Sequence, residues 1–175
     1  FDTTGYHIPG FRDETESRKE KLYYLPTVIK PGSEAERVMQ QLAVIEKLDI
    51  FDELEKKIQS FNPDLLALTV TDSTFLVAIT LLREMRRRFK QLPPTIFGGV
   101  TCAFMSEVVV RYPEVDIVCT GEGERPLTEL CRRIDQRRDY YDIPGLWVRH
   151  NGEIIKNRPD PGLTVEELNV LPVPD

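Results

Sequence analysis

The sequence is poor in the residues and motifs that mark many common kinds of site. Its 175 residues contain only two histidines, one tryptophan and three cysteines. Cys102, Cys119 and Cys131 are odd in number and widely spaced, which fits neither a disulfide framework nor a Cys-x-x-Cys metal site. Unpaired thiols are typical of a reducing compartment, so we expect a cytoplasmic protein.

Other classes are excluded by what the chain does not contain. No apolar run reaches the roughly 18 residues that a membrane-spanning helix needs, so we expect no membrane partner. The 23 basic and 29 acidic residues give a net charge of −6, which argues against a nucleic-acid surface. No Gly-x-x-x-x-Gly-Lys-Ser/Thr or Gly-x-Gly-x-x-Gly loop follows any expected strand, which argues against a nucleotide- or flavin-binding domain.

The N-terminal third carries few regular patterns. Phe1 to Tyr6 has the composition of a strand leaving a sheet, and the chain begins without Met, so we expect an earlier strand upstream of this sequence. Residues 7–32 are interpreted as a long loop, and Ser33 with Glu36 predicts a capped helix. A second helix is expected after Asp49 or Asp52, ending before Pro63.

Strands and helices then alternate. Apolar runs at residues 65–70, 95–97 and from 116 onward are expected strands, the first of them central in its sheet. Helical spacing follows over 75–89, over 103–112 and from Pro126. Because consecutive strand–helix units build parallel sheets with right-handed crossovers, we expect an α/β fold with helices on both faces.

The pattern changes after Gly145. Two alternating runs flank Asn151-Gly152, which predicts a β-hairpin with His150 exposed in its turn. The remaining stretch contains four prolines, and we expect a mostly extended linker leading out of the domain.

A polar turn rich in small residues follows each expected strand. The carboxyl ends of parallel strands meet at one sheet edge, and ligands of open α/β sheets bind there. Glycine in such turns lets a bulky ligand approach the backbone. We therefore predict a cofactor site, with no catalytic group and no metal ligand assigned, made of Thr71, Asp72, Ser73, Thr74, Gly98, Gly99, Val100, Thr101, Gly121, Glu122, Gly123 and Glu124.

Two groups in this region have a structural interpretation. Glu122 or Glu124 is expected to cap backbone N–H groups of the last turn or of the helix that follows it, although an acid–base pair is the alternative. Cys102 is expected to be a buried, inert thiol.

Several runs together resemble the N-terminal cobalamin (B12)-binding domain of B12-dependent radical S-adenosylmethionine (SAM) proteins. The resemblance covers residues 51–175 and includes little of residues 7–50. Its most specific part is the set formed by Gly121-Glu122-Gly123-Glu124, the hairpin and the Leu-Pro-x-Pro-Asp exit. The runs that carry it are Phe61–Thr69, Phe97–Thr101, Asp116–Glu124, Ile143–Val148, Asn151–Ile155 and Leu168–Asp175.

The resemblance implies a flavodoxin-like (Rossmann-like) parallel sheet, truncated at its N-terminus and followed by the hairpin. Residues 1–142 would form the cobalamin-binding-like domain, with a long variable region at 7–50. Residues 143–175 would be the hairpin and a linker to a radical SAM barrel that this chain lacks. The corrin would lie over the carboxyl edge of the sheet, with the nucleotide tail beside the strands.

In the parent protein the resemblance implies a 4Fe–4S cluster, SAM and a methyltransferase or cyclase reaction. The chain itself is then not catalytic, because it lacks the Cys-x-x-x-Cys-x-x-Cys motif that holds the cluster. The cobalt-ligating Asp-x-His-x-x-Gly motif of many B12 proteins is also absent, since Gly5 stands where His7-Ile8-Pro9-Gly10 would need Asp. Many members of the resembled family use no histidine ligand.

Two further expectations follow. The alternative function is a cofactor-free α/β interaction module that has kept the fold and uses residues 7–50 as its partner surface. Without its first strand the sheet would have an unpaired edge, so we also expect a homo-oligomer, either a dimer or a swapped assembly.

Overall fold

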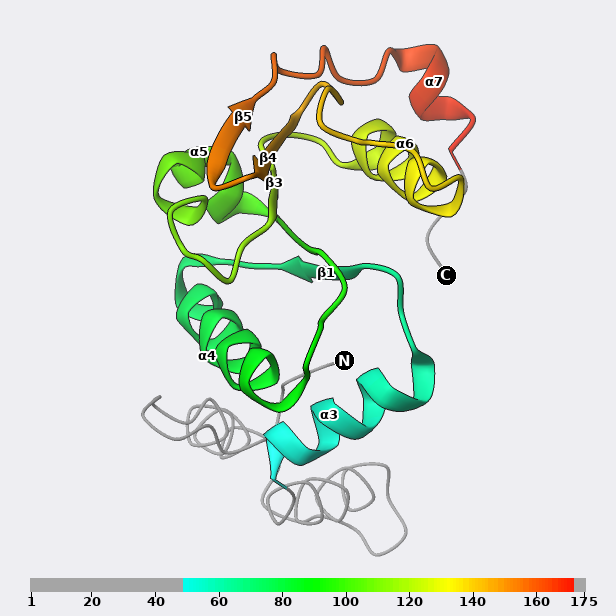
Figure 1. Cartoon of the computed structure of the whole chain (residues 1–175). Coiled ribbons are helices and arrows are strands. Elements are labelled where there is room, and N and C mark those ends of the chain that lie inside the picture. Colours follow the sequence, from blue (N-terminus) through cyan, green and yellow to red (C-terminus); the bar gives the residue numbers. More distant parts are fainter. Residues whose placement is uncertain (1–48, 172–175) are drawn as a thin grey trace, which may run out of the picture. The chain divides into compact units, whose positions relative to one another are not determined.

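The computed structural model describes residues 49–171, so the expected helix from Ser33 and the loop containing His7 lie outside the described residues (Figure 1). The chain divides into two compact units. Of the described residues, one unit contains 49–62 together with Glu84–Lys90, and the other contains Pro63–Arg83 and residues 91–171.

The first unit contains helix α3 (Ile50–Phe61), which begins as predicted. Asp49 Oδ1 caps it by accepting hydrogen bonds from the backbone N–H groups of Phe51, at 2.8 Å, and Asp52, at 3.1 Å. The helix ends at Asn62, which adopts a left-handed conformation with φ 47°. Arg88 forms ion pairs with α3, since its Nη1 lies 2.6 Å from Asp52 Oδ1 and 2.8 Å from Glu55 Oε2.

The second unit is built on a mostly parallel sheet. Its strands are β1 (Leu66–Thr69), β2 (Thr95–Gly98), β3 (Ile117–Cys119), β4 (Leu146–His150) and β5 (Glu153–Lys156), in that spatial order. The first three strands are parallel, and β4 and β5 continue the sheet antiparallel. The predicted hairpin is therefore confirmed. Its turn residues Asn151 and Gly152 both have positive φ, as a two-residue type I′ turn requires.

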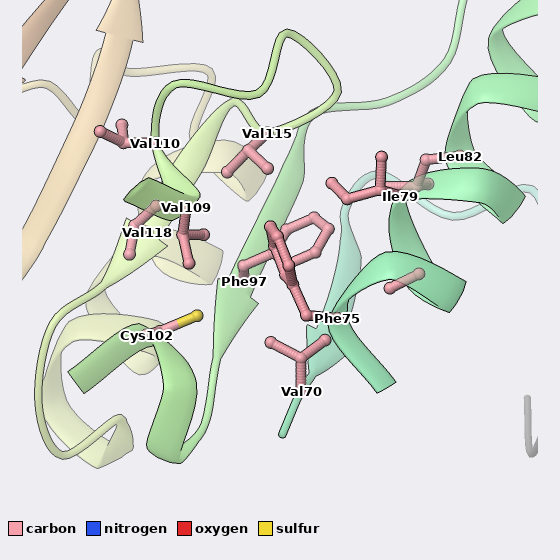
Figure 2. Packing of buried hydrophobic residues seen from close by; sticks show 11 residues of the cluster. Val70, Phe75, Ile79, Leu82, Phe97, Cys102, Val109, Val110, Val115 and Val118 are labelled. Carbon is pink, nitrogen blue, oxygen red and sulfur yellow. The ribbon is translucent and has the colours of Figure 1, made fainter. Parts of the chain in front are cut away.

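Helices cover both faces of this sheet, as predicted. Helix α4 (Asp72–Arg88), which passes through both units, and helix α5 (Val100–Val109) contribute to one buried cluster. Phe97 is fully buried in that cluster and meets Phe75 edge to face, with ring centroids 6.1 Å apart (Figure 2). Helix α6 (Glu124–Asp135) packs Leu130 against residues of β2, β3 and β4 on the opposite face.

Two predicted helix starts are wrong by three residues, because α4 begins at Asp72 and α5 at Val100. In α4, Thr71 N–H donates to Thr74 Oγ1 at 2.9 Å and Phe75 N–H donates to Thr71 O at 2.9 Å, so the polar residues form the first helical turn. In α5, Gly99 turns the chain at φ 93°, and the helix follows immediately.

Two other expectations need correction. The linker is not wholly extended, because Thr164 and Glu167 form a capping box that starts the short helix α7 (Val165–Asn169). Among residues 49–171, β1 is an edge strand and not a central one. Its Leu66 and Leu68 are half-buried, whereas Ala67 and Thr69 are exposed on the face that α6 packs against further along the sheet.

The division of the chain at residue 142 stays a prediction; in the structure both hairpin strands belong to the same sheet as β3. Within the part of the chain that the structure describes, no helix is long and apolar enough to cross a membrane.

The core assignment can be tested with two phenylalanines. Phe97 is 0% exposed, whereas Phe104 on α5 is 84% exposed. We expect Phe97→Ala to lower the free energy of unfolding by about 3–5 kcal/mol, because it leaves a cavity in the sheet–helix core. Phe104→Ala should change it by less than about 0.5 kcal/mol. Chemical denaturation of both variants decides, and equal losses would contradict the placement of these side chains.

Candidate functional site

A groove lies at the carboxyl ends of the three parallel strands and has about 500 Å³ of empty space, including space open to solvent. It is formed entirely by the second unit. The lining residues come from the ends of β1, β2 and β3, from the turn that follows β3 and from the first turns of α6. They are Ala67, Leu68, Thr69, Ile96, Gly98, Gly99, Cys119, Gly121, Gly123 and Leu127.

The floor of the groove is a row of small residues across three strands. Thr69 pairs with Gly98, and a Cβ atom on Gly98 would lie 4.0 Å from Cys119 Cβ. Two residues earlier, on the same face of the sheet, Ala67 pairs with Ile96. Because the side chains in this row are short, a flat ligand could approach the sheet closely, at the strand ends where α/β sheets bind ligands.

Not every glycine at the groove serves the same purpose. Gly99 is required by the fold itself, since its φ is 93° and a Cβ would lie 2.7 Å from the Val70 carbonyl oxygen. Gly121 and Gly123 differ, because neither has a positive φ and an added Cβ would meet no atom within 4 Å. Local structure therefore does not demand glycine at these two positions. Both residues line the groove, and glycine at a lining position lets a ligand approach the backbone.

Hydrogen bonds of the two preceding residues, Cys119 and Thr120, support the turn at residues 121–124. Thr120 donates to the Gly145 carbonyl oxygen from its backbone N–H, at 2.9 Å, and from Oγ1, at 3.1 Å. Cys119 Sγ donates weakly to Gly121 O at 3.5 Å and to Glu122 O at 3.7 Å. These bonds fix the end of β3, so the turn projects from a rigid base.

The expected capping role of the two carboxylates is wrong. Gly123 is the N-cap of α6, and no side chain of the described residues caps it. The side chains of Glu122 and Glu124 are exposed, and the first turn of α6 is held by backbone hydrogen bonds such as Leu127 N–H to Gly123 O at 2.8 Å. Both carboxylates are therefore free to face solvent or a ligand.

The predicted site residues fall into two groups. Gly98, Gly99, Gly121 and Gly123 line the groove. The others occupy the same strand ends but not the groove lining, and their contact with a ligand stays a prediction. They are Thr71, Asp72, Ser73 and Thr74 at the start of α4, Val100 and Thr101 at the start of α5, and Glu122 and Glu124 in the last turn.

The hydroxyls at the start of α4 also bond to one another. Thr71 Oγ1 lies 3.0 Å from Ser73 Oγ and 3.1 Å from Thr74 Oγ1. Sequence reasoning missed the groove residues inside the strands, among them Thr69 and Cys119. Strand periodicity could have found them, because Gly98 marks the face and its neighbours in adjacent strands must share it.

The two buried thiols, Cys102 and Cys119, have raised pKa values. Burial raises the pKa of Cys102 to about 12, with a smaller contribution from Cys119, which confirms the inert thiol expected there. Burial likewise raises the pKa of Cys119, partly opposed by a hydrogen bond with the backbone of Gly121. Cys131 on α6 is exposed.

Histidine offers no metal site in the described region. His150 is the last residue of β4 and is half-buried against Tyr141, with ring centroids 3.9 Å apart, so the expectation that it is exposed in the turn is wrong. No group of three or more His, Cys, Asp or Glu residues among positions 49–171 could hold a metal ion.

Comparison with known proteins gives this geometry a context. A family model described as the B12 binding domain matches residues 36–131. An uncharacterized methyltransferase of Pyrococcus horikoshii is 28% identical over 125 residues, which cover 71% of this chain and 27% of the relative. An anaerobic magnesium-protoporphyrin IX monomethyl ester cyclase of Synechocystis sp. is 24% identical over 69% of this chain and 24% of the relative.

A solved structure shares the fold. It is the radical S-adenosylmethionine methyltransferase TsrM from Kitasatospora setae, with cobalamin and a 4Fe–4S cluster bound. The match has a TM-score of 0.52 and 24% identity, and it covers 65% of this chain and 22% of TsrM. The chain thus spans about a quarter of the length of the proteins that it matches here.

Thiol chemistry tests the burial at the groove. At pH 8 we expect Cys131 to react quickly with a disulfide reagent, while Cys102 and Cys119 react slowly, because their raised pKa values and burial leave little accessible thiolate. Denaturant should release all three thiols. A raised folded-state pKa also means that the stability contributed by these thiols is present below their ordinary pKa of 9.0 and is lost as the pH rises above it. Rapid titration of all three thiols in the native protein would contradict this.

Proposed function

The chain belongs to the B12-binding domain family, and on that premise we propose that its groove receives the nucleotide tail of cobalamin. The observation that carries the proposal is the pair of glycines at 121 and 123, which line the groove although their backbone conformation and surroundings would admit a side chain. Together with the small-residue floor at Thr69, Gly98 and Cys119, they form a slot for a flat group.

The lining fits the tail better than the macrocycle. It is made mostly of small and apolar residues, which suit a planar base, and offers few polar side chains for the amide groups at the corrin periphery. The base would lie on the short side chains of the floor, with Leu127 of α6 as an apolar side wall. The corrin would then rest over the carboxyl edge.

The remaining predicted residues suit that second position. The hydroxyls at 71, 73 and 74 and the carboxylates of Glu122 and Glu124 can accept hydrogen bonds from amide groups at the corrin periphery. Val100 is 54% exposed at the start of α5 and offers an apolar contact at the same edge. When bound, cobalamin supplies a methyl carrier or a redox partner for radical chemistry. The residues of this chain bind and orient it.

For the whole protein we propose a radical SAM enzyme of methyltransferase or cyclase type. The relatives named above are described as a methyltransferase and a cyclase, and this chain corresponds to about a quarter of each. A 4Fe–4S cluster and SAM would be held by a barrel in the same polypeptide, downstream of the hairpin. The unpaired thiols suit a reducing compartment such as the cytoplasm.

The edge of β1 supports a further part of the proposal. Leu66 N–H donates to Pro94 O, just before β2, at 2.9 Å, and Val70 N–H donates to Gly98 O of β2 at 3.0 Å. The intervening Ala67 and Thr69 therefore direct their N–H groups away from β2. No strand among residues 49–171 pairs with this edge, and an open edge favours pairing with another strand. We expect this chain in isolation to form a dimer through that edge, and a monomeric mass in light scattering would contradict this.

Cobalamin binding is tested by filling the slot. The protein, expressed with its native flanking sequence, is mixed with hydroxocobalamin, freed of unbound ligand and examined by its visible spectrum. Gly123→Leu should abolish retention of the corrin absorbance without lowering stability by more than about 0.5 kcal/mol, because Gly123 has φ −92° and open space at its Cβ.

Gln136→Leu is the matched control, since it adds the same side chain at the other end of α6, where Gln136 is exposed. It should retain the corrin. Absence of corrin from the unmodified protein would favour the cofactor-free interaction module. Retention by Gly123→Leu would show that the cofactor binds elsewhere.

A further inference from the structure

Arg125 directly follows residues 121–124, which we call the cofactor turn, but it does not line the groove. It is the second residue of α6, and its guanidinium pairs with Glu167 of α7 and lies 3.7 Å from Asp160 Oδ1. A cation in the first turn of a helix opposes the helix dipole, so this position is unfavourable for arginine by itself. The two carboxylates compensate for it, and both come from the residues that follow the hairpin.

Those residues, 157–171, form what we call the exit segment. Its helix α7 is stabilised internally by the capping box, in which Thr164 N–H donates to Glu167 Oε2 at 2.8 Å and Glu167 N–H donates to Thr164 Oγ1 at 3.2 Å. The same carboxylate oxygen of Glu167 pairs with Arg125. The hydrogen bond from Thr164 and the pairing with Arg125 together lower the pKa of Glu167. Arg125 therefore binds a carboxylate whose position is already fixed by the capping box of α7.

A second contact joins the exit segment to the base of the turn. Gly145 has φ 80°, and a Cβ there would lie 3.0 Å from Pro126 Cγ and 3.1 Å from Asp160 Cβ. Its N–H donates to Arg158 O at 2.8 Å, and its carbonyl accepts both hydrogen bonds from Thr120. The end of β3, the first turn of α6 and the exit segment thus meet at Gly145. One of these contacts is with Thr120, the residue that precedes the turn at 121–124.

We propose that Arg125 is a positioning residue that couples the exit segment to the cofactor turn. The proposal rests on the proposed function, since the ligand of the turn is taken to be cobalamin. Arg125 acts through the backbone of residues 121–124, which precede it in the chain. Coupling between two sites is reciprocal, so an ordered exit segment strengthens cobalamin binding and bound cobalamin orders the exit segment by the same free energy.

This coupling gives the cofactor an influence beyond its own pocket. In the proposed whole protein the exit segment is where the polypeptide leaves this domain. Loading of the groove therefore fixes the direction in which the next domain begins, and an empty groove leaves that direction less constrained.

The test is hydrogen exchange of the protein with its native flanking sequence, with and without hydroxocobalamin, for the wild type, Arg125→Gln, Arg125→Lys and Arg132→Gln. Arg132→Gln is the matched control, since it removes an arginine–carboxylate pair with Glu129 on the same helix. Without ligand, Arg125→Gln should speed exchange in both residues 121–125 and residues 160–171. Arg132→Gln should leave both regions unchanged.

With ligand, cobalamin should slow exchange of residues 160–171 in the wild type but not in Arg125→Gln, whose affinity should fall about fivefold, at the low end of typical coupling. Arg125→Lys should restore most of the lost affinity, because it keeps the charge. Unchanged exchange of residues 121–125 in ligand-free Arg125→Gln would overturn the coupling. A wild type that binds no cobalamin would instead overturn the proposed function, and the ligand-free comparison would still decide the role of Arg125.

Discussion

Parallel pairing of β1 with β2 and of β2 with β3 decides where every groove residue lies. It brings three carboxyl ends to one edge and aligns Thr69, Gly98 and Cys119 in a row on one face. The opposite face of the same strands is filled by Phe97 and its neighbours, which anchor α4 and α5. Strand alternation thus places Phe97 and Val118 on one face and Thr69, Gly98 and Cys119 on the other. A shift of one residue in register would exchange the two faces and destroy both.

Much of this architecture could be predicted from the sequence because it depends on local signals. Apolar runs located the three parallel strands and Asn151-Gly152 located the hairpin, while of the two caps expected for α3, Asp49 and Asp52, the first is the one that forms. The glycines at the groove were found because successive strand ends in an α/β fold share an edge. The family was indicated by several short runs in a fixed order, and it agrees with the match over residues 36–131.

What the sequence did not reveal depends partly on local caps and turns and partly on contacts between residues far apart in the chain. The early starts of α4 and α5 come from a hydroxyl cap at Thr71 and Thr74 and from the sharp turn at Gly99, which override the apparent loop character of polar residues. The exit segment looked extended because of its prolines. Its helix depends on a capping box and on Arg125, which is 42 residues from Glu167. The groove residues within the strands become apparent only when the register is known.

The structure thus presents a cofactor turn with two kinds of support. The bonds from Thr120 and Cys119 hold it to the end of β3, and the contacts around Gly145 and Arg125 hold it to the segment that leaves the hairpin. Its outer surface, at Gly121 and Gly123, remains open. The turn is thus hydrogen-bonded at its base and uncovered at its two glycines. Such a turn can receive a large ligand without rearrangement, which limits the entropy lost on binding.

The most direct test of the central claim compares cobalamin with cobinamide, the corrin that lacks the nucleotide tail. Competition for the protein with its native flanking sequence measures the two affinities under the same conditions. If the groove receives the tail, cobalamin should bind at least about tenfold more tightly, a difference of about 1.4 kcal/mol. Equal affinities would show that the tail makes no contact with the protein and would contradict the assignment of the groove.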